Sequence, residues 1–482
     1  MILALIIIIP LLIAAISAII QKGTRLLEFL TVFSSGAVFF FSIIIADKVL
    51  ADQSYSLLPY LKVSSFGAIL LLLTSFISLI ASLYSIGYLR TEVKKEVIGF
   101  SRVKQYFVLL NVFLTSMIFA ISFTSPIMTW VAVEATTLST AFLISFYNKP
   151  SSLEAAWKYL IINSVGLLLA FFGTILFMAG PMTHGGNIGL ITWNELMTSA
   201  NTLNPSVIKI AFVFILIGYG TKMGLVPMHT WLPDAHSKAP VPISSLLSGV
   251  LLNIALFTIL RFKIAADGVV GINFSSNLFI YFGLFSILVS SLLIYLQTNY
   301  KRLLAYSTIE HMGIIALGIG FGSIGLFASI LHMIYHSLAK PLLFLTSGNI
   351  FLKFSSTKIE KIKGVFQAIP LTGALFLIGI FAITGVPPFG IFMTEFSILA
   401  AGIQSHPIVA GFTLLGLVLI FIGFLKHASS MIFGEKPKDI AAGESNSWTT
   451  VPLILLATVL IFLSLYLPGP LKLLIERATL IF

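Results

Sequence analysis

Long apolar runs alternate with short polar connections along almost the whole chain. A helix needs about 20 apolar residues to cross the hydrocarbon core of a membrane. Fourteen runs reach or approach that length, so the pattern predicts an all-α polytopic membrane protein with about 14 transmembrane helices and no soluble domain. The predicted helices span residues 2–20, 26–46, 66–86, 106–123, 126–147, 152–180, 206–228, 240–262, 276–297, 302–321, 324–350, 367–400, 407–433 and 449–467.

Two of these helices contain proline in mid-span. Pro227 lies in the seventh helix, and Pro387 and Pro388 lie in the twelfth. Proline lacks a backbone donor, and the bilayer core holds no bulk water to replace the lost hydrogen bond. The pattern therefore predicts that both helices are broken. In the connection before the seventh helix, residues 193–197 predict a short interfacial helix.

A weak internal symmetry relates helices 4–8 to helices 9–13. In each set the fourth helix is the proline-broken one, and the second carries a glutamate, Glu134 or Glu310. Because five is an odd number of crossings, the second set must be inverted. Paired interruptions in inverted repeats are typical of a transport site. The predicted divisions are 1–105 with helices 1–3, 106–262 with the first repeat, 276–433 with the inverted second repeat, and 449–482 with helix 14 and the tail.

Composition agrees with a membrane protein. The 482 residues are 58% hydrophobic and only 9% charged, whereas soluble domains carry about 25% charged residues. The net charge of +11 is attributed to basic loops on one membrane face rather than to nucleic-acid binding. Seventeen of the 28 lysines and arginines fall on one side and seven on the other, which predicts that both termini lie outside. The first helix has no basic segment before it and no cleavage site, so we expect it to be retained.

The chain contains no cysteine. This excludes thiolate metal sites, iron–sulfur ligation and disulfides within it. We therefore expect no cofactor in this chain and assign any redox chemistry to partner subunits.

Charged side chains occur inside the predicted helices, although a charge at the bilayer centre costs from about 2.5 to more than 10 kcal/mol. Lys222 stands beside the seventh-helix break, and Glu134 lies in the fifth helix of the same repeat. We predict that they pair, so that the charge of each alters the proton affinity of the other. The alternative is a static ion pair that holds two helices together.

Helix 11 carries His332, His336 and Lys340 at a spacing of four residues. Residues at this spacing line one helical face about 6 Å apart along the axis, and water can bridge such gaps. Histidine changes charge near neutral pH, so the face is suited to passing protons. Two histidines four apart also suit zinc, but no acidic third ligand is evident on this face, and we predict no metal site. A purely structural histidine pair is the other alternative.

Three further titratable residues lie within the predicted helices 10 and 12. Glu395 follows the helix-12 break and either joins the pathway or snorkels toward the outer end of its helix. Glu310 and His311 are neighbours on helix 10. Adjacent residues do not share a helical face, so we expect one of them to join the pathway while the other contacts a different helix.

Other candidates lie closer to the inner membrane face. Asp234 and His236 stand near the inner end of helix 7. They form either a cytoplasmic entrance or the cap of the following turn. Lys426 on helix 13 joins the pathway or snorkels toward the basic face.

The run from Thr221 to His236 resembles the signature of the antiporter-like membrane subunits. These subunits occur in respiratory complex I, in Mrp-type sodium/proton antiporters and in membrane-bound hydrogenases. The resemblance continues through residues 240–244 and 303–307 and covers roughly helices 4 to 13. Residues 306–313 and 387–396 are most similar to hydrogenase-4 component F and its relatives.

The resemblance implies fourteen helices with inverted five-helix repeats and a polar axis in the membrane plane. It implies that Glu134 is the helix-5 glutamate of the family, which modulates the proton affinity of Lys222, and that Lys222 and Lys340 are its helix-7 and helix-11 lysines. It also places Glu395 at the helix-12 position, where family members carry lysine or glutamate. His229 lies within the signature run and is a further candidate.

One departure from the family pattern concerns helix 8. Many members place a lysine or histidine there, whereas this chain has Asn253. Asparagine does not exchange a proton at neutral pH. Either water bridges this position, or the two half-pathways are less tightly joined than in relatives.

We therefore predict a proton- or sodium-translocating subunit of a prokaryotic membrane-bound respiratory complex of the hydrogenase type, with no catalytic residues of its own. Ions would enter near Asp234 and His236 and leave by Glu395. The predicted pathway comprises Glu134, Lys222, His332, His336, Lys340 and Glu395. Further candidates for the pathway or its entrance are His229, Asp234, His236, Asn253, Glu310, His311 and Lys426.

The expected partners are other membrane subunits, including further antiporter-like ones, and peripheral redox subunits with iron–sulfur or nickel–iron centres. Two alternatives stay open at this point. One is a self-standing Mrp-type sodium/proton antiporter subunit. The other is a structural membrane module whose axis has lost conduction, as the presence of Asn253 in helix 8 would indicate.

Overall fold

The computed structural model describes residues 1–183, 191–198 and 203–481. Its first half contains α1 (Ile2–Ile19), α2 (Thr24–Asp52), β1 (Ser54–Leu57), β2 (Leu61–Ser64), α3 (Ser65–Lys94), α4 (Phe100–Ser122), α5 (Pro126–Ile144), α6 (Pro150–Thr183), α7 (Trp193–Thr198), α8 (Pro205–Met223), α9 (Trp231–Lys238) and α10 (Val241–Leu246). The second half contains a π-helical turn (Leu247–Leu251), α11 (Leu252–Val270), α12 (Ile272–Tyr295), α13 (Tyr300–Gly320), α14 (Ser323–Phe354), a 3₁₀ turn (Ile359–Lys361), α15 (Val365–Ala368), α16 (Pro370–Ile383), α17 (Gly390–Ser405), α18 (Pro407–Ile432), a second 3₁₀ turn (Ser447–Thr449), α19 (Val451–Leu465) and α20 (Gly469–Thr479).

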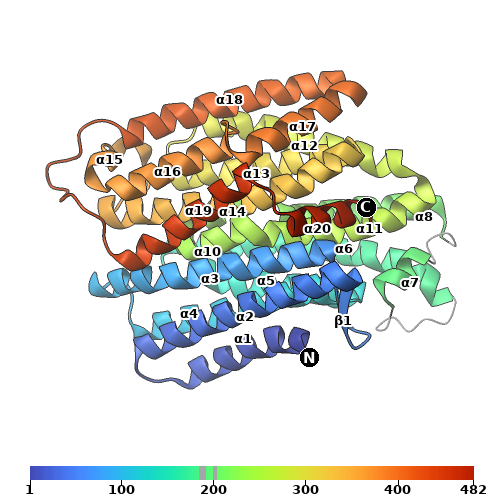
Figure 1. Ribbon diagram of the computed structural model, residues 1–482, viewed down its shortest axis with the longest axis horizontal. Coiled ribbons are helices and arrows are strands. Elements are labelled where there is room, and N and C mark those ends of the chain that lie inside the picture. Colours follow the sequence, from blue (N-terminus) through green and yellow to red (C-terminus); the bar gives the residue numbers. More distant parts are fainter. Residues whose placement is uncertain (184–190, 199–202, 482) are drawn as a thin grey trace.

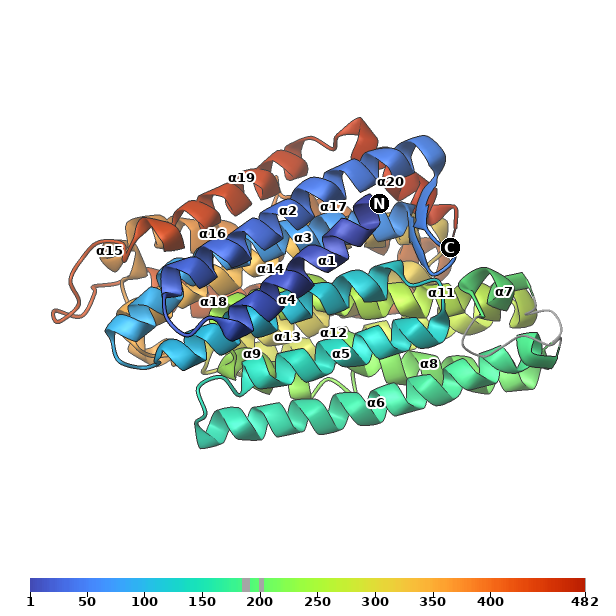
Figure 2. The same cartoon turned by 90° about the horizontal axis from the view of Figure 1, so that it is seen from below.

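The long helices run alongside one another as a single bundle (Figure 1). In Figure 1, α18 forms one edge and α1 the other, and in Figure 2 α19 and α6 lie at opposite edges. Twelve helices of the described chain are long and apolar enough to cross a membrane. The 32-residue α14 and the α16–α17 pair bring these to the fourteen segments predicted. The prediction of an all-α polytopic membrane protein is confirmed.

Both predicted helix breaks are present. α8 stops at Gly224, whose φ is 85°, and the chain resumes as α9 at Trp231. α16 is followed by Gly385, whose φ is 65°, and the chain resumes as α17 at Gly390. Glycine adopts this left-handed backbone without the steric cost of a Cβ. Each interrupted segment therefore ends one half-helix and starts another within the bundle.

The interior of the bundle is formed by α10, α11, α13 and α14. The most apolar stretches of residues 241–270 and of α13 are entirely buried, whereas those of α1, α2, α6, α18 and α19 are at most 39% buried. An interior helix does not face lipid, so it can carry polar side chains that meet polar partners from its neighbours. This arrangement places the candidate residues of α13 and α14 in the centre of the protein.

Some local features differ from the sequence expectation or add to it. The short helix predicted at residues 193–197 is present as α7. The β1–β2 hairpin was not predicted. Neither was α20, whose Arg477 donates a 2.7 Å hydrogen bond to the Leu50 carbonyl of α2. The π-helical turn interrupts the otherwise continuous helix from α10 to α11, and such turns are frequent at functional sites.

Candidate functional site

Lys222 lies in the last turn of α8, with its side chain completely buried. Its Nζ donates to Thr137 Oγ1 of α5 at 2.9 Å and to the Tyr159 hydroxyl of α6 at 2.7 Å. Tyr159 also lies 2.7 Å from Thr140 Oγ1, and Thr140 donates its own proton to the Thr136 carbonyl. Tyr159 therefore donates to Thr140 and accepts from Lys222. The lysine is held by neutral hydroxyl groups.

Glu134 is part exposed on α5 and accepts a 2.9 Å hydrogen bond from Ser164 of α6. Its other carboxylate oxygen has no hydrogen-bond partner among the described residues. The Lys222 ammonium contacts Thr137, which lies three residues, or about one turn, beyond Glu134 on α5. Glu134 and Lys222 are therefore not in direct contact, because the hydroxyl groups of α5 and α6 bind the ammonium, but the Glu134 charge still acts on Lys222 through space.

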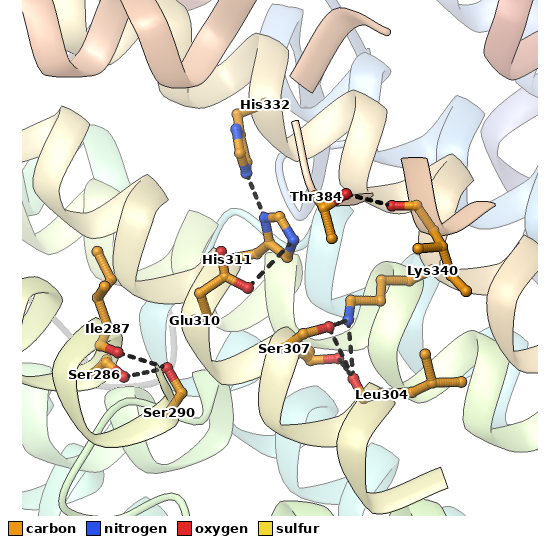
Figure 3. Close-up of polar contacts among 12 residues, drawn as sticks. Ser286, Ile287, Ser290, Leu304, Ser307, Glu310, His311, His332, Lys340 and Thr384 are labelled. Carbon is orange, nitrogen blue, oxygen red and sulfur yellow. Dashed lines mark hydrogen bonds and ion pairs between the residues drawn. The ribbon is translucent and has the colours of Figure 1, made fainter. Parts of the chain in front are cut away.

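Lys340 of α14 is likewise completely buried. Its Nζ donates to the Leu304 carbonyl at 2.9 Å and to the Ser307 hydroxyl, both on α13 (Figure 3). Lys222 in the first half of the chain and Lys340 in the second thus have similar hydrogen-bond partners. The Lys222 ammonium is bonded to neutral oxygen atoms of α5 and α6, and that of Lys340 to neutral oxygen atoms of α13.

A histidine cluster lies between α13, α14 and α17. His332 Nε2 is 2.9 Å from His311 Nδ1, and His332 Nδ1 is 2.9 Å from Thr394 Oγ1. On its other side, His311 Nε2 lies 3.6 Å from Oε2 of Glu310 (Figure 3). His311 thus contacts α14 through His332, and Glu310 also lies close to His311. Adjacent helical positions differ by about 100°, but these side chains are long enough for their polar ends to approach each other.

His336 and Asn253 adjoin this cluster. The His336 ring centre is 5.3 Å from that of His311, and neither His336 ring nitrogen has a hydrogen-bond partner in the described chain. Asn253 donates to Ser337 Oγ at 2.9 Å and to the Gly249 carbonyl at 3.0 Å. Asn253, which does not exchange protons, is therefore bonded to α14 at Ser337, the residue that follows His336.

The two residues predicted to form an inner entrance have different surroundings. Asp234 is part exposed and forms ion pairs with Arg302 at 2.9 Å and Lys158 at 3.4 Å. His236 is completely buried, and its ring stacks on Phe344 of α14 with centres 5.1 Å apart. Asp234 thus marks the accessible side of α9, whereas His236 lies inside the bundle.

Glu395, on α17, completes the cluster. One of its carboxylate oxygens lies within 4.8 Å of one ring nitrogen of His311 and of one ring nitrogen of His332. Both histidines are completely buried, whereas Glu395 is part exposed. The structure therefore brings together side chains from α13, α14 and α17 that are far apart in the sequence.

Two candidates lie apart from these contacts. His229 is bonded at 3.3 Å to the Pro227 carbonyl of its own turn. Lys426 is exposed on α18, with its Nζ 4.3 Å from the centre of the Tyr295 ring. This position agrees with the snorkelling alternative for Lys426.

Residues 123–423 match the family described as NADH:quinone oxidoreductase/Mrp antiporter, TM. The chain belongs to this family. It is 38% identical over 382 residues to the hydrogenase-4 component F homolog of Methylacidiphilum infernorum (isolate V4), a match that covers 79% of this chain and 80% of that protein. The resemblance inferred from the signature run is therefore confirmed, and the chain is an antiporter-like membrane subunit.

Two solved structures have the same fold as this antiporter-like subunit. One is a chain of the membrane-bound sulfane sulfur reductase, an archaeal respiratory membrane complex, with a TM-score of 0.88 and 24% identity over 99% of this chain and 97% of that one. The other is a chain of the Mrp complex from Dietzia sp. DQ12-45-1b, with a TM-score of 0.86 and 19% identity over 99% and 96%.

Sequence reasoning did not single out the neutral groups that hold the two lysines of the antiporter-like subunit. Thr137 follows Glu134 by three residues and so lies near it on one helical face, which is a signal that periodicity offers. Tyr159 and Ser307 carry no comparable local signal, since each meets its lysine only through the packing of two helices.

A second polar region was also missed. A cavity of about 440 Å³ lies where the ends of α3, α6, α9, α13 and α14 meet. Glu92 borders this cavity, is buried, and accepts a 2.7 Å hydrogen bond from Tyr147. The cavity is also lined by four lysines: Lys95, Lys149, Lys238 and Lys301. The sequence analysis had counted them only among the basic residues of the loops.

Proposed function

We propose that this chain translocates protons, or sodium ions, as the antiporter-like subunit of a prokaryotic membrane-bound respiratory complex of the hydrogenase type. The observation that carries this proposal is that two completely buried lysines, Lys222 and Lys340, donate hydrogen bonds to neutral oxygen atoms. A hydroxyl oxygen accepts from an ammonium group, and a hydroxyl proton can be donated to a neutral amine. Such partners accommodate both protonation states. The carboxylates of Glu134 and Glu310 act through space on Lys222 and Lys340, respectively.

The first part of the proposed route runs from the cytoplasm to Lys222 and on to α14. Ions enter near Asp234 on the accessible side of α9. On the same helix, Trp231 packs edge-on against Tyr159, the partner of Lys222, with ring centres 5.1 Å apart. His236, five residues further along α9, is stacked on α14. This short helix thus contacts the surroundings of both lysines and supports a water-bridged path between them.

The second part of the proposed route follows α14. From Lys340 the path passes His336 and the His311–His332 pair and leaves by Glu395, the part-exposed member of the cluster. Asn253 lies beside this path without a group that exchanges protons, so water bridges that position in the proposal.

Both ends of the proposed axis point to partners. Glu134 and Glu395 are part exposed in the isolated chain, and a carboxylate that faced lipid would be costly. We propose that these ends face further membrane subunits. Redox energy would come from peripheral subunits with iron–sulfur or nickel–iron centres, as the likeness to a hydrogenase-4 component F homolog suggests.

The proposal includes the orientation and the repeats inferred from the sequence. Both termini lie on the outer side, and residues 106–262 and 276–433 form two inverted repeats. A helix break in each of these segments, at Gly224 and at Gly385, supports the division.

Purification of the intact complex from native membranes in mild detergent tests the assignment. We expect further membrane subunits and peripheral subunits that contain iron and nickel to copurify with this chain. After reconstitution into liposomes, substrate turnover should drive ion uptake, which a pH-sensitive dye and a sodium-selective probe measure in parallel. Copurification solely with small membrane subunits, in a preparation free of iron and nickel, would show the hydrogenase assignment to be wrong.

Replacing Tyr159 with phenylalanine tests the role of the Lys222 surroundings. The change removes one hydroxyl partner of the ammonium and keeps the ring packed against Trp231. A hydrogen bond to a charged group contributes about 1.5–3 kcal/mol, so we expect ion flux in the reconstituted complex to fall about tenfold or more. The control is Tyr60→Phe at an exposed tyrosine. Equal flux in both variants would contradict the role of Tyr159.

A further inference from the structure

We propose that His311, His332 and Glu395 form a zinc-binding site in the second half of the protein. The two imidazole nitrogens and one carboxylate oxygen all lie within 4.8 Å of one another. They come from three helices, α13, α14 and α17, and converge inside the bundle. The sequence analysis predicted no zinc site because the face of α14 that carries His332 and His336 has no acidic third ligand. In the structure, α17 packs beside α14 and supplies Glu395 as that ligand.

The donor set suits zinc. Two histidine nitrogens with one carboxylate oxygen, and a fourth position left open, form a frequent zinc coordination. The facing nitrogens of His311 and His332 are 2.9 Å apart. Ligands of a tetrahedral zinc ion, with bonds of about 2.0–2.1 Å, are separated by roughly 3.3 Å. The two rings therefore need to separate by a few tenths of an ångström, and the Glu395 carboxylate, within 4.8 Å of the nitrogens, needs to move closer, by at most roughly 1.5 Å, to bind the same ion.

The hydrogen bonds around His332 direct a lone pair into the site. Thr394 Oγ1 donates its single proton to the Ile391 carbonyl at 2.8 Å. It must then accept from His332 Nδ1, which lies 2.9 Å away. Neutral His332 therefore carries its proton on Nδ1 and presents the unprotonated Nε2 toward His311. A metal-ligating histidine almost always donates its other N–H to such an oxygen acceptor.

On the His311 side, two buried atoms lack a partner. His311 Nε2 and Glu310 Oε2 are 3.6 Å apart, and neither has a hydrogen-bond partner in the described part of the chain. Without metal, His311 donates from Nδ1 to His332. If the His311 proton moves to Nε2, Glu310 becomes its acceptor and Nδ1 is free to bind zinc. This arrangement is the carboxylate–histidine–zinc triad, and it satisfies both atoms at once.

The same chemistry limits which ions fit. Calcium takes six to eight oxygen ligands, and magnesium requires an octahedral shell that retains several waters. A pair of imidazoles with a single carboxylate does not provide either. Of the three ligand residues, both histidines are completely buried and Glu395 is part exposed. If ions also move along these residues as proposed above, bound zinc would block that route, but zinc binding itself does not depend on translocation.

Zinc binding is measured directly on the full-length chain in detergent. Zinc sulfate is titrated against a competing chelator dye in excess magnesium, and X-ray absorption at the zinc edge identifies the ligands. We expect one tight zinc ion per chain with nitrogen and oxygen ligands. His311→Gln and His332→Gln should each weaken affinity at least about hundredfold. Thr394→Val and Glu310→Gln, which change the groups behind the ligands, should weaken it about 10–100-fold.

His406→Gln is the matched control, since His406 follows α17 and stacks on Phe321 away from the site. Size-exclusion elution and circular dichroism establish that each variant is folded. A wild-type chain that binds no zinc overturns the proposal, and so does equal affinity in His311→Gln, His332→Gln and the control. Because this experiment measures no transport, a negative result disproves only the zinc site. Absence of translocation in the reconstituted complex would likewise not disprove zinc binding.

Discussion

Ion translocation is expected to fall about hundredfold or more when Lys222 is replaced by alanine. The change removes the ammonium that Thr137 and Tyr159 hold inside the first half of the protein. Near the helix break, α8 has no other lysine, and no histidine or carboxylate. Loss of a proton-transfer group typically slows a reaction by about 10²–10⁴-fold. The measurement is dye-detected proton uptake, or sodium uptake, by liposomes containing the intact complex.

Lys209→Ala provides the control for Lys222→Ala. Lys209 lies on the same helix but is exposed, with its ammonium 5.7 Å from the centre of the Phe274 ring, and we expect it to leave flux unchanged. Complex yield and subunit composition show whether the variants assemble. If an assembled Lys222→Ala complex still translocates ions with the wild-type stoichiometry, the proposed route through Lys222 is refuted.

Replacing Lys340 with arginine is expected to stop translocation to a similar extent, about hundredfold or more, although the positive charge is kept. Arginine is not deprotonated in proteins, so it cannot pass on a proton. Its planar, forked head group also differs from the compact ammonium that Ser307 and the Leu304 carbonyl hold. Lys340→Met, which removes the charge and keeps much of the length, should block flux as well. The same liposome assay measures both variants.

The pair of Lys340 variants separates two explanations. If Lys340 served only as a fixed positive charge, Lys340→Arg would remain active while Lys340→Met would not, and proton exchange at this position would be ruled out. Lys353→Arg is the matched control on α14. Its ammonium is bonded to the Gly443 carbonyl near the end of the helix, and we expect full activity.

The sequence by itself determined the membrane-spanning architecture and the two helix breaks. Spanning depends on the length of an apolar run, which is a local property. A break at Pro227 or at Pro387 follows from a missing backbone donor, which is also local. Lys222 and Lys340 likewise stand out within their apolar runs, because a charge in the bilayer is costly wherever its helix packs. Family membership could be predicted as well, because the run at 221–236 is continuous in the chain.

Only the tertiary structure decided which groups meet. Lys222 is bonded to Thr137 and Tyr159 of other helices rather than to Glu134, and Glu310 approaches His311 although the two are neighbours on one helix. The carboxylate of Glu395 reaches the histidines only because α17 packs beside α14. The physical reason is that the hydrophobicity of a segment is a sum over its own residues, whereas a side-chain contact depends on the angle and rotation at which two helices pack. No single segment of the sequence specifies that packing.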